Sequence, residues 1–259
     1  MEKALEFAVE IARSAGKVQK DNYEKRGLVV HHKGLINLVT EVDLECEKLI
    51  VSAISKKYPG HDILAEEGTD VKSDSGYAWY IDPLDGTTNY AHGFPVFAPS
   101  VALAYKGEPL VGAVYDPLRD EMFSGIKGGG AFLNGNRLAV SKVDNIDGAL
   151  LGTGFPYDLR TNKANNIENF NNAAMHCQAV RRAGAAALDL CYVACGRFEG
   201  FWEQWLYAWD MAAGALFVAE AGGVVTNMKG KPLDLFGKTI CAGNPAIHPK
   251  LLSLLTGPS

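Results

Sequence analysis

Apolar positions recur with a helical period in two stretches of the first half of the chain. In residues 2–24 and in about 41–57 they return every three to four positions, which predicts two amphipathic helices. Thr40 directly precedes the second stretch and predicts a helix N-cap. Residues 31–38 show little periodicity and predict a loop or a hairpin.

Short apolar runs bounded by glycine, proline or aspartate predict strands in the same half. These runs are 62–65, a run that ends at Asp82, 97–105, 110–115 and 121–126. We expect the last three to form an antiparallel meander, and the glycines at 128–130 followed by Asn134-Gly135 predict tight hairpin turns after it. We expect the strand before Asp82 to end there and the chain to turn before Asp85.

From about residue 146 the pattern changes to strands that alternate with helices. The predicted strands are 149–153, 198–203, 224–227 and 239–242. The predicted helices are 164–177, 185–195, 209–221 and 246–255. This change predicts an N-terminal α+β lobe, 1–144, and a C-terminal α/β lobe, 145–259. No low-complexity linker separates the lobes, so we expect them to pack tightly.

Composition and charge narrow the class of protein. The chain has 259 residues, of which 47% are hydrophobic and 21% charged, as in a globular protein with a sizeable core. A net charge of −5 disfavours nucleic acid or an acidic membrane surface as the main partner. The five cysteines lack Cys-x-x-Cys spacing and no signal peptide is visible, which predicts a reduced, cytoplasmic setting. Asp210 and Glu220 interrupt the apolar run 208–225, which we interpret as a buried helix and not a membrane span.

The candidate chemistry is concentrated in the stretch Trp-Tyr-Ile-Asp-Pro-Leu-Asp-Gly-Thr-Thr-Asn-Tyr. Its two carboxylates, Asp82 and Asp85, lie three positions apart, where a turn would direct both at one point and leave the Leu84 carbonyl available. Gly86 permits a close backbone approach, and its amide and that of Thr87 could open a short helix. Such amides form an anion site. The pattern predicts cations on the acids beside a phosphate on the amides.

Acids from several segments are expected to gather at one edge of the first sheet. Two such charges about 4 Å apart repel by about 4 kcal/mol at an effective dielectric near 20. The acids must therefore be protonated or neutralised by bound cations. All candidate ligands are oxygens, which favours Mg²⁺, with Mn²⁺ possible, and disfavours zinc. We expect Glu66, Asp82 and the Leu84 carbonyl to hold one ion. Asp82, Asp85 and Asp210 are expected to hold a second ion.

Several of these residues also have ordinary structural interpretations. Asp43 lies three residues after Thr40 and is typical of a capping-box acid. Asp210 is typical of an acid at a helix N-terminus. Glu66, taken alone, is typical of a solvated turn, and a threonine such as Thr87 at a helix start is typical of a cap. The residues alone leave both interpretations open.

Four motifs resemble those of a known family. Asp-Pro-Leu-Asp-Gly-Thr-Thr-Asn at 82–89 resembles the signature of the inositol monophosphatase family, which comprises magnesium-dependent, lithium-sensitive sugar-phosphate phosphatases. The segments 38–43, 64–68 and 208–214 are similar to its other motifs and follow in the expected order. The resemblance covers nearly the whole chain. It implies a layered α/β/α/β/α sandwich of the type shared with fructose-1,6-bisphosphatase, and a homodimer.

The resemblance also implies roles for single residues. The metal ligands named above match the family position by position, and Asp85 and Asp210 also lie at substrate-binding positions. Thr87, paired with Asp43, resembles the device that positions or deprotonates the attacking water, with Glu66 as a further catalytic residue. The amides of Gly86 and Thr87 are implied to hold the phosphate.

The family match nominates further contacts at the edge of this site. Glu203 and the backbone near Ala186 are implied to contact substrate hydroxyls, with Arg182 and Asp189 as lesser candidates that also suit a salt bridge and a bond to a neighbouring helix, respectively. Phe155 and Tyr157 are more typical of core or wall residues, and His92 is at least as typical of a structural histidine as of a residue that supports the site. A third, loosely held ion is implied near the 31–38 segment, where Lys33 matches a lysine of the family and Asn37 stands where many relatives have aspartate.

The predicted function is magnesium-dependent hydrolysis of small polyol phosphate monoesters by metal-activated water, with inositol-1-phosphate as the preferred substrate. Fructose-1,6-bisphosphatase activity, alone or as a dual specificity, is the main alternative. A non-catalytic regulatory binding protein on the same fold is a lesser alternative. Every proposed metal ligand is present in the sequence, which favours an enzyme.

Overall fold

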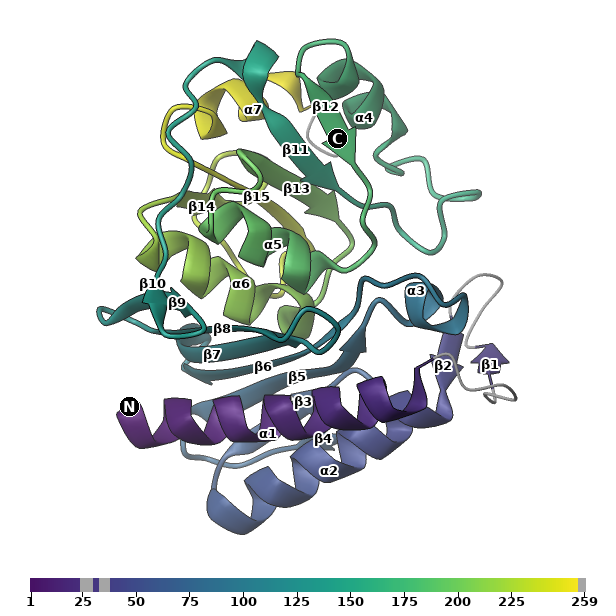
Figure 1. The fold of residues 1–259 in the computed structure, drawn as a ribbon, viewed down its shortest axis with the longest axis vertical. Helices are drawn as coiled ribbons and strands as arrows, with labels where there is room; N and C mark the ends of the chain where they lie inside the picture. Colours follow the sequence, from purple (N-terminus) through teal and green to yellow (C-terminus); the bar gives the residue numbers. More distant parts are fainter. Residues whose placement is uncertain (24–29, 33–37, 256–259) are drawn as a thin grey trace.

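The computed structural model describes residues 1–23, 30–32 and 38–255. From bottom to top, Figure 1 shows a pair of long helices, a large sheet, a second pair of helices, a small sheet and an outer pair of helices. In this order the helices are α1 (Glu2–Asn22) and α2 (Glu41–Lys57), α5 (Ala186–Ala194) and α6 (Ala208–Glu220), and α4 (Ile167–Ala174) and α7 (His248–Leu254). The arrangement is the α/β/α/β/α sandwich that the family resemblance implies.

The large sheet has eight strands in the order β10-β9-β8-β7-β6-β5-β3-β4. Its strands are β3 (Asp62–Ala65), β4 (Asp70–Val71), β5 (Tyr77–Asp85), β6 (Ala98–Tyr105), β7 (Glu108–Asp116), β8 (Glu121–Ile126), β9 (Gly130–Leu133) and β10 (Asn136–Arg137). The predicted meander is confirmed as β6, β7 and β8. Among the described strands of this sheet, only β3 and β5 pair in parallel. The chain between them reverses direction through the edge strand β4, which pairs antiparallel with β3.

The prediction that the strand ends at Asp82 was wrong, because β5 continues through Asp85. The pairing of β5 with β6 shifts register between these two acids. Pro83 lacks a backbone N–H and cannot donate to the ladder, which explains an irregularity at this point. Its freed carbonyl accepts a hydrogen bond of 2.8 Å from the side chain of buried Gln19 on α1. The first helix therefore supports the backbone between the two acids.

Local sequence signals explain the start of α2. The Thr40 side chain accepts hydrogen bonds from the backbone N–H groups of Val42 and Asp43, and the Asp43 carboxylate accepts one from the Thr40 N–H at 2.9 Å. This reciprocal capping box confirms the predicted N-cap. Together with the amphipathic pattern it fixes α2 at the predicted bounds.

The small sheet has five strands in the order β12-β11-β13-β15-β14. These strands are β11 (Leu150–Thr153), β12 (Ala179–Arg181), β13 (Gly200–Gln204), β14 (Val224–Thr226) and β15 (Thr239–Gly243). The short helices α3 (Thr87–Ala91) and η1 (Ile146–Gly148) and the strand pair β1 (Val30–His32) and β2 (Leu38–Thr40) complete the described elements. The segment 31–38 was predicted to be a loop or a hairpin, and the antiparallel pairing of β1 with β2 supports the hairpin. Lys33 and Asn37 lie outside the described residues.

The helix predicted at 164–177 is shorter than expected, because α4 spans only Ile167–Ala174. Asn162 and Asn165 accept hydrogen bonds from backbone N–H groups two residues further on, which forms turns that compete with the helix. Asn166 has a left-handed backbone with φ 71. The edge strand β12 follows α4 and was not predicted.

The main apolar core joins residues on both sides of the predicted boundary at 144/145. It includes Tyr80 and Phe123 from the large sheet and Phe201 and Phe217 from the second half of the chain. A side chain at Gly112 on β7 would lie 2.9 Å from the Phe217 ring, so glycine allows α6 to pack directly on the sheet. The two parts of the chain thus pack through a shared core. Across the described residues, no helix has the length and apolar character needed to cross a membrane.

Candidate active site

A cavity of about 350 Å³ lies where the ends of β3 and β5 meet the second half of the chain. The predicted site residues that line it come from six places in the fold: Glu66, Asp82, Leu84, Asp85, Gly86, Thr87, Arg182, Ala186, Glu203 and Asp210. Asp43 lies next to it through its bond to Thr87. The exposed His92 and the buried Asp189 are not among the residues that line the cavity. The fold therefore brings together the residues nominated for the first two metal ions and most of those nominated for the substrate.

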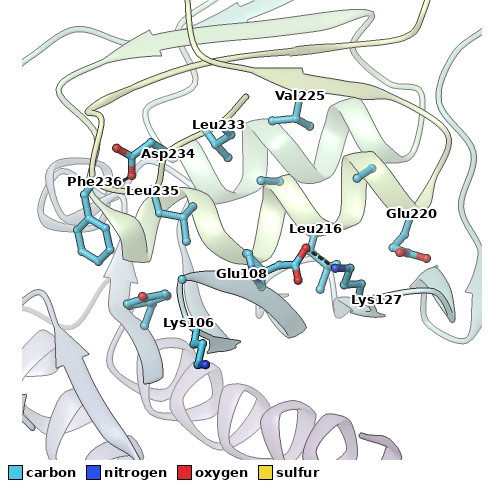
Figure 2. A pocket seen from close by; sticks show the side chains of 15 residues that line it. Lys106, Glu108, Lys127, Leu216, Glu220, Val225, Leu233, Asp234, Leu235 and Phe236 are labelled. Carbon is cyan, nitrogen blue, oxygen red and sulfur yellow. Dashed lines mark hydrogen bonds and ion pairs between the residues drawn. The ribbon is translucent and has the colours of Figure 1, made fainter. Parts of the chain in front are cut away.

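Figure 2 shows a second, larger cavity of about 850 Å³ on the other side of α6. Its lining is mainly apolar, with Leu216, Leu233 and Leu235 among its residues. Lys127 and Glu108 at its edge form an ion pair with each other. None of the predicted site residues lines it. We assign the site to the smaller cavity, because catalytic chemistry requires convergent polar groups more than volume.

The backbone places Glu66 beside β5. Its N–H donates to the Ile81 carbonyl at 3.1 Å. Ala65 pairs with Ile81 in the parallel register, so Glu66, the next residue, lies beside Asp82. Asp85 accepts a hydrogen bond of 2.7 Å from the Ala187 N–H in the first turn of α5, 102 positions away in sequence. This bond joins the end of β5 to the second half of the chain.

Burial, and to a smaller extent the charges of their neighbours, raises the pKa of the acids in the cavity. Burial, and then the charges of Glu66, Asp85 and Asp210, raises the pKa of Asp82 well above its ordinary value of 3.8. Burial raises the pKa of Asp85 to about 7, and the Ala187 N–H opposes this shift. Burial and the charge of Asp85 raise the pKa of Asp210 to about 7 as well. Like charges held this close favour a bound cation or a shared proton.

The donor set fits a hard cation, with carboxylates and the Leu84 carbonyl as the available oxygens. Among the residues the structure describes, no group of three or more His, Cys, Asp or Glu side chains is arranged to hold a metal ion by itself. Magnesium is commonly bound through one or two carboxylates, with water and substrate phosphate as its other ligands. The cavity therefore suits Mg²⁺ in its donor chemistry and charge without forming a closed protein cage.

Thr87 and Asp43 form a buried pair behind the acids. The Thr87 hydroxyl lies 2.8 Å from an Asp43 carboxylate oxygen and 3.0 Å from the Leu84 carbonyl, and it donates to these acceptors. Burial raises the pKa of Asp43, while bonds from Thr40 and Thr87 oppose the shift. Asp43 is therefore both the predicted capping acid and the partner of Thr87.

Gly86 forms the turn between β5 and α3. Its φ of 95 is a left-handed conformation, and a Cβ there would lie 2.7 Å from the Val96 carbonyl oxygen. Only glycine fits both constraints. Because the first amides of a helix lack intrahelical acceptors, the amides that follow Gly86 suit an anion.

Glu203 forms part of the opposite wall. Burial, and then the charges of Asp189 and Asp210, raises the pKa of Glu203 well above its ordinary value. A Cβ at Gly154 would lie 2.1 Å from a Glu203 carboxylate oxygen, so Gly154 leaves the space that this carboxylate occupies. Gly154 was missed, because a single glycine after a strand gives no signal of its distant neighbour.

Asn89 and a set of aromatic residues were not among the predicted site residues. The Asn89 amide nitrogen donates to the Val96 carbonyl at 2.8 Å and to the Ala183 carbonyl at 2.9 Å, which links α3 to the loop that carries Arg182. The aromatic residues that line the cavity are Phe155, Tyr157, Trp205, Tyr207 and Trp209. Phe155 and Tyr157 were noted only as wall or core residues.

Comparison with known proteins supports the family resemblance. Residues 1–257 match the family model described as "Inositol monophosphatase family". The Nus factor SuhB of Pseudomonas aeruginosa is 45% identical over 98% of this chain and 96% of its own length. The inositol-1-monophosphatase of Mesorhizobium japonicum is 41% identical with the same coverage of both chains. The structure of the Anabaena inositol monophosphatase superposes with a TM-score of 0.89 at 40% identity, covering 98% of this chain and 95% of that one. The chain therefore belongs to the inositol monophosphatase family and is a phosphatase.

Proposed function

We propose that this phosphatase hydrolyses small polyol phosphate monoesters in a magnesium-dependent reaction, with inositol-1-phosphate as the preferred substrate. One observation carries the proposal: acids from both halves of the chain line a single cavity together with the Gly86 turn and Glu203. The relative from Mesorhizobium japonicum named inositol-1-monophosphatase supports the substrate.

The proposed ligands for one Mg²⁺ are Glu66, Asp82 and the Leu84 carbonyl, and those for a second are Asp82, Asp85 and Asp210. When bound, such ions make water a stronger nucleophile and stabilise negative charge on phosphate oxygens. A third ion would involve the segment around Lys33, which lies outside the described residues. Mn²⁺ has the same ligand preference and is expected to substitute.

The residues around this corner position the other reactants. Thr87, held by Asp43, orients the water for in-line attack on phosphorus, with Glu66 beside it as an acceptor for the water's hydrogen. The amides of Gly86 and Thr87 bind the phosphate oxygens. Phosphorus is inverted without a covalent enzyme intermediate, and the alcohol leaves toward the opposite wall.

That wall determines which alcohol fits. The Glu203 carboxylate and the backbone at Ala186 bind hydroxyl groups of the polyol. Burial raises the pKa of Asp85, Asp189 and Glu203, and the positive charge of Arg182 opposes this shift in each case. We propose that the Arg182 guanidinium partly balances the negative charge of the acids in this wall. Lithium inhibition, a cytoplasmic location and a homodimer also remain proposals that follow the family.

A panel of phosphate esters tests the proposal. With Mg²⁺, purified protein should release phosphate from inositol-1-phosphate faster than from fructose-1,6-bisphosphate. Asp85→Asn should reduce kcat/KM by about a hundredfold or more, because it removes one carboxylate of a metal corner. Asp74→Asn, which changes an exposed acid elsewhere, is the matched control and should leave kcat/KM unchanged.

Three other outcomes would change the assignment. Faster turnover of fructose-1,6-bisphosphate would favour the bisphosphatase alternative. Equal activity of Asp85→Asn and the parent would remove the site assignment. Absence of phosphate release from every ester would favour a non-catalytic role, of the kind indicated by the name Nus factor that several relatives with 42–45% identity carry.

A further inference from the structure

Three aromatic side chains that line the candidate active site are unusually exposed. Tyr157, Trp205 and Tyr207 keep 50%, 44% and 47% of their surface accessible. Large aromatic side chains are normally mostly buried, because exposing them forfeits hydrophobic free energy. A group of exposed aromatic rings around a polar cavity therefore indicates a surface that is covered when a ligand binds.

Trp205 also has a backbone conformation that tryptophan rarely adopts. Its φ is 67, in the left-handed region where a bulky side chain is strained and glycine is not. The backbone is held there by Lys238, whose carbonyl accepts hydrogen bonds from the N–H groups of Trp205 at 2.6 Å and Leu206 at 3.2 Å. Tryptophan at such a strained position suggests a role for the ring itself.

The orientation of the Trp205 ring is fixed from outside the cavity. Its indole N–H donates to the Ala164 carbonyl at 2.9 Å, in the segment before α4. Among the described residues, Trp205 makes no ring contact with another aromatic side chain. Its indole is thus positioned in advance of binding, with no aromatic ring or cation of the described residues stacked on it.

Tyr207 differs from Trp205, although both line the cavity. The Tyr207 ring stacks on Trp209 with centroids 4.8 Å apart and planes 5° from parallel. The Lys238 ammonium lies 3.2 Å from the Tyr207 ring centroid. Both neighbours occupy faces of the tyrosine ring, so Trp205 is the aromatic residue better able to stack on a ligand.

We propose that Trp205 is a specificity-determining residue that favours ring-shaped leaving groups over open-chain ones. The inference rests on the proposed function and names the class of alcohol that the site selects. Trp205 lies two positions after Glu203, and both line the cavity. The carbon face of a cyclic polyol packs against the indole, whose negative face attracts C–H groups, while Glu203 binds a ring hydroxyl. An open-chain polyol lacks that face and loses more rotational freedom on binding.

The test compares kcat/KM for inositol-1-phosphate, which is cyclic, with kcat/KM for glycerol-2-phosphate, which is open-chain. In Trp205→Gly the ratio of the two values should fall about tenfold, mainly through KM for the cyclic ester. The melting temperature of Trp205→Gly should not fall in proportion to the kcat/KM ratio, because glycine adopts a φ of 67 without strain. This separates loss of a substrate contact from loss of the fold.

Two further variants sharpen the comparison. Trp205→Phe retains an aromatic face but lacks the indole N–H, and it should keep most of the ratio. Phe236→Ala removes an aromatic residue that is 58% exposed beside the other cavity, and it should leave the ratio unchanged.

Two results would overturn the inference while phosphatase activity persists. The first is an unchanged ratio in Trp205→Gly. The second is a loss in Trp205→Phe as large as that in Trp205→Gly, which would show that the bond to Ala164 matters and the ring face does not. Failure of the unaltered protein to release phosphate from either ester would instead overturn the proposed function on which the inference depends.

Discussion

Asp43 and Asp210 each accept a hydrogen bond at the start of a helix, and each also lies in or beside the cavity. Asp43 caps α2 through the Thr40 N–H and accepts from Thr87, and Asp210 accepts a hydrogen bond of 2.6 Å from the Tyr207 N–H at the start of α6. The ordinary interpretations, Asp43 as a capping-box acid and Asp210 as an acid at a helix N-terminus, are confirmed, and the proposed chemical roles are compatible with them. Substituting either acid would change the fold and the chemistry together.

Asn89 allows a clearer prediction at the scale of one residue. Asn89→Ala removes the side-chain donor to the Val96 and Ala183 carbonyls. Both carbonyls lose this hydrogen bond in a buried or partly buried environment. We expect a loss of about 2 kcal/mol in the free energy of unfolding, since unsatisfied buried groups cost about 1–3 kcal/mol. We also expect kcat/KM to fall about tenfold, because α3 would lose its link to the Arg182 loop. Urea unfolding and phosphate-release kinetics measure the two effects.

Asn172→Ala is the matched control for Asn89→Ala. Asn172 donates a comparable hydrogen bond of 2.7 Å to the Leu254 carbonyl, between α4 and the end of α7 and away from the cavity. It should lower stability without lowering kcat/KM. Asn89→Ala with normal kinetics would show that the link to the Arg182 loop does not position the site.

At the scale of elements, β5 connects an aromatic cluster to the acids. Trp79 near its start is fully buried, and its indole N–H donates to the Nδ1 of His61 at 3.1 Å. The His61 ring also stacks against Tyr58 and Tyr77, with centroids 5.0 and 4.8 Å away. The same strand ends in the irregular segment from Asp82 to Asp85. The contacts of Trp79 therefore help to position the strand that carries Asp82 and Asp85.

The His61 contact predicts a pH dependence of stability. Burial lowers the pKa of His61 below its ordinary value of 6.5, and the charge of Asp62 opposes this. The unfolded chain therefore binds a proton at a higher pH than the folded chain. The His61 contribution is fully present above pH 6.5 and is lost as pH falls below 6.5 through the folded pKa. Protonation would also place a hydrogen on the Nδ1 that accepts from Trp79.

Urea midpoints at pH 7.5 and 5.5 measure this effect. The drop in midpoint between the two pH values should be smaller in His61→Gln, whose side chain offers an acceptor that does not titrate in this range. His92→Gln, at an exposed histidine, serves as the control. An unchanged drop in His61→Gln would show that other groups cause the pH dependence.

At the scale of the whole molecule, the candidate metal site joins the two halves of the chain. Asp82 and Asp85 end a strand of the large sheet, whereas Asp210 starts the helix that packs between the two sheets. The hydrogen bond from Ala187 to Asp85 and the shared apolar core cross the same boundary. The division into lobes at 144/145 remains a prediction, and the site draws on both of them.

Magnesium should therefore stabilise the whole fold. At a Mg²⁺ concentration about a hundredfold above Kd, binding to the folded state contributes about 2.7 kcal/mol. For a chain of this size that corresponds to a rise in Tm of about 5 °C or more, which chelation with EDTA should reverse. Scanning calorimetry with and without Mg²⁺ measures the change. Asp85→Asn should lose most of the gain and Asp74→Asn none, and a full gain in Asp85→Asn would contradict the assigned ligand.

Features that depend on neighbouring residues were readable from the sequence. The bounds of α2 follow from an N-cap, a reciprocal acid and an amphipathic pattern, all within one segment. The order of the acids, glycine and threonines around Asp82 was sufficient to nominate a metal and phosphate site, and four motifs in order were needed to nominate a family. Errors arose where local signals competed, as in the asparagine turns before α4, or were very short, as in β12.

What only the tertiary structure decided is which distant residues meet. Strand order and crossovers set those distances, and the spacing along the chain does not encode them. The structure places Asn89 across from Ala183, Gly154 against Glu203, and Trp205 at the cavity in a strained conformation. The sequence by itself determined the chemical groups and most of the elements. The packing of two sheets around α5 and α6 decided which of those groups share a cavity, because side chains far apart in sequence interact only through such packing.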